Sequence, residues 1–255
     1  MSNPFADLPA FMSVGAMQAY VILMIVLVVA GTIFDVIHKK SAKYFFEAAE
    51  KGKEARTREV GGGEKVSIAI KTLANEVLTS GEFDNGQRRL AHLLTMWGLV
   101  LFLLATIVLL FGLGAGAFWP FVWHLGALMA AAGGYWFWFK IRVDVSAEGN
   151  PWYRITRADL FVLSLVATVT FALLWSIFQG AGGLGTLFFI LFLVAGLVLF
   201  GGVPWSKFAH MFFKPAAAYQ RHVKEADGSR QNLPPPADKP AQFGLGIKRE
   251  APRHY

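Results

Sequence analysis

The chain has 255 residues, of which 55% are hydrophobic, 15% aromatic and only 16% charged, and it contains no cysteine. This composition is too apolar for an ordinary water-soluble domain, and the lack of cysteine excludes disulfides, cysteine-ligated iron–sulfur clusters and haem attached through a CxxC motif. The formal charge of +7 comes without a groove-reading motif or a basic strand interleaved with aromatic residues, so we expect no nucleic-acid partner.

Five apolar runs are long enough to cross a bilayer, whose hydrocarbon core needs roughly 20 apolar residues per helix. They lie at about 14–37, 91–111, 117–139, 159–178 and 184–203. No basic residue precedes the first run, which is also too long for the apolar region of a signal peptide, so we expect it to remain in the mature protein. We therefore predict an all-α integral membrane protein built as a bundle of five transmembrane helices.

Basic residues fall on only one side of these predicted helices. Residues 39–89 contain eleven Lys and Arg, residues 140–158 contain four, and residues 204–255 contain nine, which together are all 24 in the chain. By the positive-inside rule the N-terminus lies outside and the C-terminus lies in the cytoplasm. We expect a multi-pass membrane protein, whose basic cytoplasmic face meets anionic lipid or an acidic partner surface.

Two segments are rich in charge. Residues 39–89 first alternate Lys, Arg and Glu and then, after the glycines at 61–63, carry apolar residues at helical spacing. This pattern predicts two interfacial helices joined at the glycines. Residues 215–255 are rich in Pro and charge without a periodic apolar face, which predicts an extended tail, either disordered or wrapped around a partner. The predicted organisation is a first helix within 1–38, a cytoplasmic loop at 39–89, a four-helix core at 90–214, and this tail.

Two histidines are predicted to lie at the same depth near the cytoplasmic face. His92 begins the second run, and His210 follows the fifth run, which has the opposite direction. Each has a cation three residues earlier on the same helix face, Arg89 or Lys207. Two imidazoles on antiparallel helices can hold a b-type haem, with the cations beside its propionates and a glycine such as Gly98 leaving room for the macrocycle. The alternative is a set of interfacial polar residues without a cofactor.

Further residues are candidates for contact with a membrane quinone. His124 lies near the outer end of the third run, where it either contacts quinone or hydrogen-bonds a neighbouring helix. Trp205 follows the fifth run. Asp159, at the start of the fourth run, and Asp35, late in the first, either relay a proton to quinone or are solvated carboxylates at the interface.

The chain resembles the cytochrome b membrane subunits of the nitrate reductase gamma type, a superfamily that includes the membrane parts of heterodisulfide reductase. The resemblance is carried by three segments: QRRLAHLLTMWG at 87–98, RADLFVLSLVATVTF at 157–171 and VPWSKFAHMFFKP at 203–215. The small size and basic tail are most similar to the membrane anchors of adenylylsulfate reductase.

The resemblance implies that His92 and His210 ligate haem b, and that electrons pass between a cytoplasmic flavin and iron–sulfur reductase and the quinone pool. Two-haem members carry a deeper histidine on each of the two ligand-bearing helices, whereas the stretches around Phe102 and Phe192 contain none. We therefore expect one haem, with quinone chemistry on the cytoplasmic side and no charge transfer across the membrane by this subunit alone.

Other functions are weighed against this one. A cofactor-free anchor that docks a soluble reductase through the basic loop and tail is the main alternative. A transporter is disfavoured because the apolar runs show no buried ion pair and no internal repeat. The sequence also lacks the HExxH, GxSxG and phosphate-loop motifs of common enzymes, so the chain is predicted to be either a non-catalytic or a quinone-reacting subunit.

Overall fold

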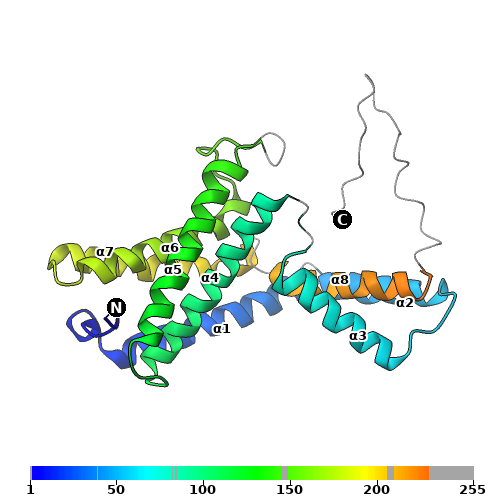
Figure 1. The fold of residues 1–255 in the computed structure, drawn as a ribbon, viewed down its shortest axis with the longest axis horizontal. Coiled ribbons are helices and arrows are strands. Elements are labelled where there is room, and N and C mark those ends of the chain that lie inside the picture. Colours follow the sequence, from blue (N-terminus) through cyan, green and yellow to red (C-terminus); the bar gives the residue numbers. More distant parts are fainter. Residues whose placement is uncertain are drawn as a thin grey trace. The chain divides into compact units, whose positions relative to one another are not determined.

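The computed structural model describes residues 2–38, 40–81, 83, 85–144, 149–205 and 210–229, and every regular element among them is a helix (Figure 1). The helices fall into two units. We call the unit formed by the described residues of 1–35 and 85–209 the bundle unit, and the one formed by those of 36–84 and 210–229 the charged unit. Each unit is described by itself below.

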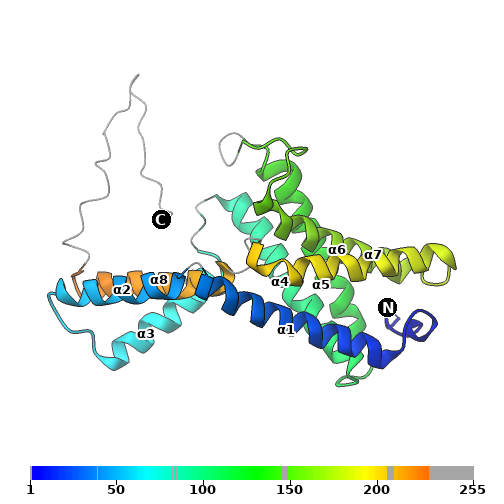
Figure 2. The ribbon, with the colours of Figure 1, turned by 180° about the vertical axis from the view of Figure 1, so that it is seen from behind.

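The bundle unit contains the five predicted apolar helices. They are α1 (Val14–His38, whose last three residues belong to the charged unit), α4 (Gly86–Leu110), α5 (Phe118–Trp136), α6 (Leu160–Phe178) and α7 (Gly183–Gly201). Figures 1 and 2 show α4 beside α5 and α6 beside α7, in each case with a short turn between the two helices. Short 3-10 or π segments flank them: η1 (Leu8–Ala10), η3 (Phe137–Ile141), η4 (Arg157–Asp159) and η5 (Val203–Trp205).

Four helices are long and apolar enough to cross a membrane: α1, α4, the segment Arg157–Phe178 that contains α6, and α7. The chain is therefore a multi-pass membrane protein by length and composition. The fifth predicted span is also a helix, α5, but its 19 residues include Pro120, His124, three tryptophans and a tyrosine, which lower its apolar character. The crossing by α5 and the orientation of the bundle stay predictions.

Glycines bring α4 and α5 into close contact. A Cβ atom added at Gly126 would lie 2.5 Å from the backbone nitrogen of Phe102, and one at Gly133 would lie 2.5 Å from the Ala91 carbonyl oxygen. Gly98 faces the Ala130 backbone at similarly close range. Small residues at helix contacts let backbones approach closely, as is common in membrane helices.

The first helix belongs to the same packed body. The Gln18 side-chain amide donates to the Leu110 carbonyl oxygen at the end of α4 (2.8 Å), and the Tyr20 hydroxyl donates to the Leu193 carbonyl oxygen of α7 (2.7 Å). Tyr20 can approach α7 because Gly196 lies opposite it, where a Cβ would be 2.5 Å from the hydroxyl. We had expected the first helix to be separate from a four-helix core. Instead, α1 packs with the other four helices in the bundle unit.

Aromatic side chains fill the interior of the bundle unit. We call Phe102, Trp123, Trp175 and Phe192 the aromatic cluster; all four are at most 4% exposed. The ring centroids of Phe102 and Trp123 are 5.1 Å apart, those of Trp175 and Phe192 are 6.2 Å apart, and Phe102 meets Phe192 edge-on at 6.4 Å. Offset and edge-on arrangements of this kind are the favourable ones for aromatic rings.

The N-terminal segment closes one side of the aromatic cluster. Phe5 lies 5.9 Å from Trp123 and 5.7 Å from Trp175 between ring centroids, and Phe11 lies 5.9 Å from Trp175. Leu8 is fully buried. The residues that precede α1 are therefore part of the core, which their mixed polar and apolar sequence did not reveal.

The charged unit is formed from α2 (Ser41–Glu54), α3 (Gly62–Thr72), the π-helical segment η2 (Leu73–Leu78) and α8 (His210–Ala226). The first two agree with the pair of helices expected on either side of the glycines at 61–63. The Gln220 side-chain amide donates to the Phe45 carbonyl oxygen (3.0 Å), which connects α8 to α2, and the Thr57 amide donates to the Asp227 carbonyl oxygen (2.9 Å).

The expectation of an extended tail is wrong for residues 215–226. These residues continue α8 as a helix with Pro215 inside it; the proline lacks an N–H, so the helix forgoes one backbone hydrogen bond at this position. The helix makes polar contacts with α2 and η2, whose partners are far away in the sequence and could not be inferred from residues 215–226 alone. The remainder of the predicted tail, 230–255, lies outside the described residues.

Candidate functional site

Of the two halves of the predicted haem site, the structure describes the one with Arg89 and His92, at the beginning of α4. The Asn85 side chain accepts hydrogen bonds from the amides of Gln87 (2.9 Å) and Arg88 (3.1 Å), which caps the helix. This cap fixes where the helix begins and thereby places Arg89 and His92 on its first two turns. Both side chains are half-buried, so His92 lies at the polar end of a helix able to span the membrane.

The other half of the predicted haem site is not described to the same extent. Lys207 and the side chain of His210 lie outside the described residues, and the backbone of His210 begins α8 in the charged unit. The pairing of His92 with His210 stays a prediction from the sequence.

Gly98 has a role in packing. Its Cα faces the Ala130 amide and the Gly126 carbonyl of α5, where an added Cβ would clash with the backbone. The missing side chain at this position makes room for α5, so nothing in the structure assigns it to a macrocycle.

His124 links two helices. Its Nδ1 lies 2.7 Å from the Pro120 carbonyl oxygen, and its Nε2 lies 2.9 Å from the Ser176 hydroxyl of α6. A carbonyl only accepts, so Nδ1–H donates to Pro120, and in a neutral imidazole Nε2 then accepts from the Ser176 hydroxyl. The hydrogen bond to a neighbouring helix, the alternative to quinone contact, is the arrangement found.

Asp159 forms a buried ion pair with Arg142, a residue that the sequence analysis did not single out. The guanidinium donates to both carboxylate oxygens, at 2.6 Å from Nη2 and 3.2 Å from Nε, and the side chains are 1% and 13% exposed. Its nitrogens also donate to the carbonyl oxygens of Pro151 (2.7 Å) and Arg154 (2.5 Å), and its Cζ lies 4.3 Å from the Trp138 ring centroid.

This ion pair corrects one expectation. Asp159 is not a solvated carboxylate, because it also accepts from the Thr156 amide and hydroxyl (both 2.8 Å) in a capping box at the start of η4. The pair joins the loop after the third apolar run to the start of the fourth, so it does not contradict the expectation that the apolar runs themselves contain no buried ion pair. A sequence gives no sign of the Arg142–Asp159 pair because the two partners are 17 positions apart, on both sides of a loop.

The remaining positions named from the sequence lie apart from these contacts. Trp205 ends η5 with 67% of its surface exposed, whereas Asp35 in α1 is 4% exposed. Phe102 and Phe192 belong to the aromatic cluster.

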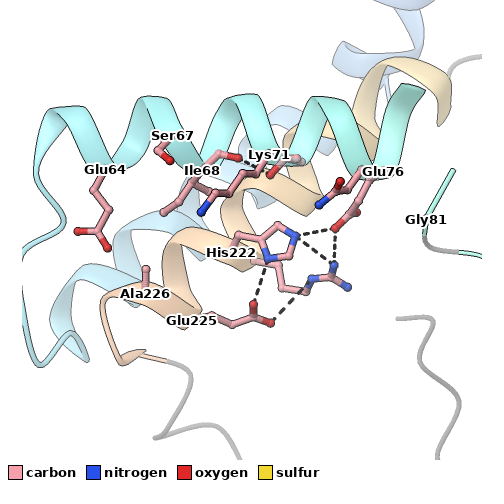
Figure 3. Close-up of a pocket in the computed structure, with 12 residues that line it drawn as sticks. Glu64, Ser67, Ile68, Lys71, Glu76, Gly81, His222, Glu225 and Ala226 are labelled. Atoms are coloured by element: carbon pink, nitrogen blue, oxygen red, sulfur yellow. Dashed lines mark hydrogen bonds and ion pairs between the residues drawn. The ribbon is translucent and has the colours of Figure 1, made fainter. Parts of the chain in front are cut away.

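A second group of polar residues lies in the charged unit and was missed from the sequence. Its centre is His222 on α8, whose Nε2 is 2.6 Å from a Glu76 carboxylate oxygen and whose Nδ1 is 3.1 Å from Glu225 (Figure 3). Arg221 donates to the same Glu76 oxygen at 2.7 Å. We call Glu76, Arg221, His222 and Glu225 the His222 cluster. The spacing of His222 and Glu225, three residues apart on a helix, is the signal that could have found it.

The His222 cluster lines a groove of about 780 Å³ between α3, η2 and α8 (Figure 3). Its other lining residues include Glu64, Ser67, Lys71 and Asn75. Carboxylates only accept hydrogen bonds, so His222 serves both Glu76 and Glu225 at once only as an imidazolium with two N–H donors. Within the described part of the chain, no group of three or more His, Asp or Glu side chains is placed to hold a metal ion.

Comparisons of the chain with protein-family models, curated proteins and solved structures found no significant match. Its function is therefore argued from the residues themselves.

Proposed function

We propose that the chain is the membrane subunit of an oxidoreductase complex and passes electrons between a cytoplasmic flavin and iron–sulfur reductase and the quinone pool through one haem b. The observation that carries this proposal is the position of His92, half-buried on the second turn of α4, one turn after Arg89. A potential axial ligand and a potential propionate partner thus share one end of a helix that is able to span the membrane.

The chemistry of the predicted donor set fits haem. Neutral imidazole nitrogens are axial ligands of b-type haem, and a guanidinium pairs with carboxylates such as propionates. His92 and Arg89 would supply one side, and His210 with Lys207 the other; this second pair rests on sequence position, not on the arrangement of the two units. When bound, the haem would supply one-electron transfer, while the chain's side chains ligate its iron and neutralise its propionates.

The filled interior supports a single haem. At the deeper level of the bundle unit, Phe102 and Phe192 are in ring contact with each other and with Trp123 and Trp175. A flat macrocycle would have to displace these buried rings. With one redox centre at the cytoplasmic side, quinone would react at that side, where exposed Trp205 is a better candidate for contact than His124 or Asp159, whose polar atoms are engaged.

A cofactor-free anchor is the second candidate. It is favoured because Gly98, His124 and Asp159 each make contacts within the bundle unit that explain their presence without a cofactor. In this function the chain holds a soluble reductase, of which adenylylsulfate reductase is the example implied by the family resemblance, at the bacterial inner membrane without relaying electrons.

Haem quantitation separates the two functions. Reduced minus oxidised spectra of the purified chain are expected to show one haem b in wild type and in the control variant His222→Gln, and none in His92→Ala or His210→Ala. Gel filtration checks that each variant is folded. Absence of haem from wild type purified with haem available, or its retention in both ligand variants, would contradict the electron-transfer proposal and leave the anchor.

A further inference from the structure

The helix α3 has a polar face toward α8 and an apolar face that is exposed. The residues that line the groove toward α8 are mainly polar and include Glu64, Ser67 and Lys71. On the opposite side lie Val66, Ile70 and Leu73 at the start of η2, which are 59%, 62% and 52% exposed. Residues spaced by three and four positions share one face of a helix, and we call these three the outer stripe.

The exposed position of the outer stripe is opposite to that of the apolar face in a water-soluble protein. A surface helix of a soluble protein turns its apolar face to the core and its polar face to water, whereas α3 turns its polar face to α8 and its apolar face outward. A contiguous apolar face of this kind marks a surface that is covered in the working protein.

The rest of the chain identifies what covers the outer stripe. Four of its helices are able to cross a membrane, so the protein lies at a bilayer. Only residues 79–85 separate the end of η2 from the start of α4, and seven residues span at most about 25 Å. Whatever the arrangement of the two units, α3 is therefore held within reach of the bilayer surface.

We propose that α3 lies along the membrane surface with Val66, Ile70 and Leu73 inserted among the lipids. Amphipathic helices bound in this way bury their apolar face about 5–10 Å into the boundary between headgroups and acyl chains. The groove with the His222 cluster, on the opposite face of α3, is then turned toward water, where a soluble partner can reach it. This inference requires only the membrane helices and holds with or without haem.

Site-specific labelling tests the proposal in the full chain. The natural sequence has no cysteine, so Ile70→Cys and Leu73→Cys, on the outer stripe, and Ser67→Cys and Lys71→Cys, on the groove face, each provide one labelling site. Every variant is labelled with an environment-sensitive fluorophore and placed in nanodiscs that hold a single chain. Quenching is measured with nitroxide-labelled lipid and, separately, with aqueous iodide.

We expect the extent of quenching to differ between the two faces of α3. Labels at positions 70 and 73 are quenched several-fold more by the lipid nitroxide than labels at 67 and 71, and iodide gives the opposite order. Equal lipid quenching on both faces, or free access of iodide to 70 and 73, overturns the proposal. Protection that appears only when several chains share one vesicle would also overturn it, because it would assign the stripe to a second copy.

A second measurement does not depend on the labels. The double variant with Ile70→Glu and Leu73→Glu is expected to become more sensitive to trypsin at Lys65 and Lys71 in nanodiscs, because carboxylates do not enter the acyl region. The matched variant Ser67→Glu, on the groove face, keeps the wild-type rate. Equal cleavage of wild type and the double variant would count against insertion.

Discussion

The interior of the bundle unit and the groove of the charged unit are stabilised by opposite means. In the bundle unit, Phe102, Trp123, Trp175 and Phe192 meet ring against ring with almost no exposed surface. In the charged unit, Glu76, Arg221, His222 and Glu225 meet through charges whose side chains are 15% to 41% exposed. A packed apolar interior tolerates few changes, whereas partly exposed charges can change partner or protonation state at low cost.

This difference indicates that the polar groups of the two units have different roles. The polar groups of the bundle unit, such as Arg142 with Asp159 and His124 with Ser176, fix the positions of helices and loops. The groups of the His222 cluster remain accessible to water and to partners. The proposed function would need both features: a rigid support for α4, which carries His92, and an adaptable charged surface for a soluble partner.

The largest effect is expected for the ion pair of the bundle unit. Arg142→Met leaves the Asp159 carboxylate with only its contacts to Thr156 and the Pro151 carbonyl without its donor. Breaking a fully buried pair costs about 3–5 kcal/mol, and because Asp159 is 13% exposed we expect a loss toward the lower end of this range. The control is Arg154→Met, which removes an exposed guanidinium but keeps the Arg154 carbonyl. Thermal unfolding in detergent should show a clear loss of stability only for Arg142→Met; equal stability would show that the pair does not hold the loop.

A smaller but still large effect is expected from a single methyl group between α4 and α5. Gly98→Ala places a Cβ against the Ala130 backbone, and overpacking of a tight contact costs about 1–3 kcal/mol. Gly15→Ala is the matched control, because nothing lies within 4 Å of the added Cβ. A Gly98→Ala variant as stable as the control in the same unfolding assay would mean that the two helices can separate without cost.

The sequence predicted the helices better than the contacts between them. All five apolar runs are helices within a few residues of the predicted bounds, because a long apolar run is a local property of the sequence. The Arg142–Asp159 pair and the contacts of Phe5 with Trp123 depend on residues far apart in the chain, and no local pattern contains them.

The candidate sites show the same limit. His92 was placed correctly at the polar end of α4, because charge segregation marks helix ends. The contacts of Gly98 and His124 could not be predicted, because the sequence does not show whether a glycine or histidine packs against a helix or binds a ligand. The His222 cluster was missed because α8 is stabilised by polar partners in a segment whose Pro and charge content is typical of disorder.

A moderate effect is expected when the charged unit loses His222. His222→Gln removes the imidazole that bridges the Glu76 and Glu225 carboxylates, at 2.6 and 3.1 Å, and should loosen α8. Because the side chains of the His222 cluster are 15% to 41% exposed, the loss is at most about 1 kcal/mol.

Hydrogen exchange of the α8 amides in the full chain measures this effect. Protection of α8 should be lower in His222→Gln than in wild type. Exchange of α4 in the same samples is the internal control, because α4 contributes no group to the cluster. An α8 whose protection is the same in wild type and in His222→Gln would contradict the bridging role of His222.

The smallest effect concerns Arg58 and Glu64, an exposed pair in the charged unit. Arg58 donates to both Glu64 oxygens (3.0 and 2.5 Å), which lowers the pKa of Glu64 below its usual value. A lowered carboxylate pKa contributes stability that is present above the usual pKa and is lost as the pH falls through the lowered one. Carboxyl NMR should show the titration of Glu64 moving to higher pH in Arg58→Gln.

The matched control is Arg56→Gln, which removes the same charge from the neighbouring exposed pair with Glu59 (2.8 Å) and should leave the Glu64 titration unchanged. An unchanged Glu64 titration in Arg58→Gln as well would assign the lowered pKa to the general positive charge of the segment. Because both members of the pair are exposed, α8 should stay folded in either variant. The charged unit would then change its charge without unfolding, whereas loss of Arg142 should destabilise the bundle unit.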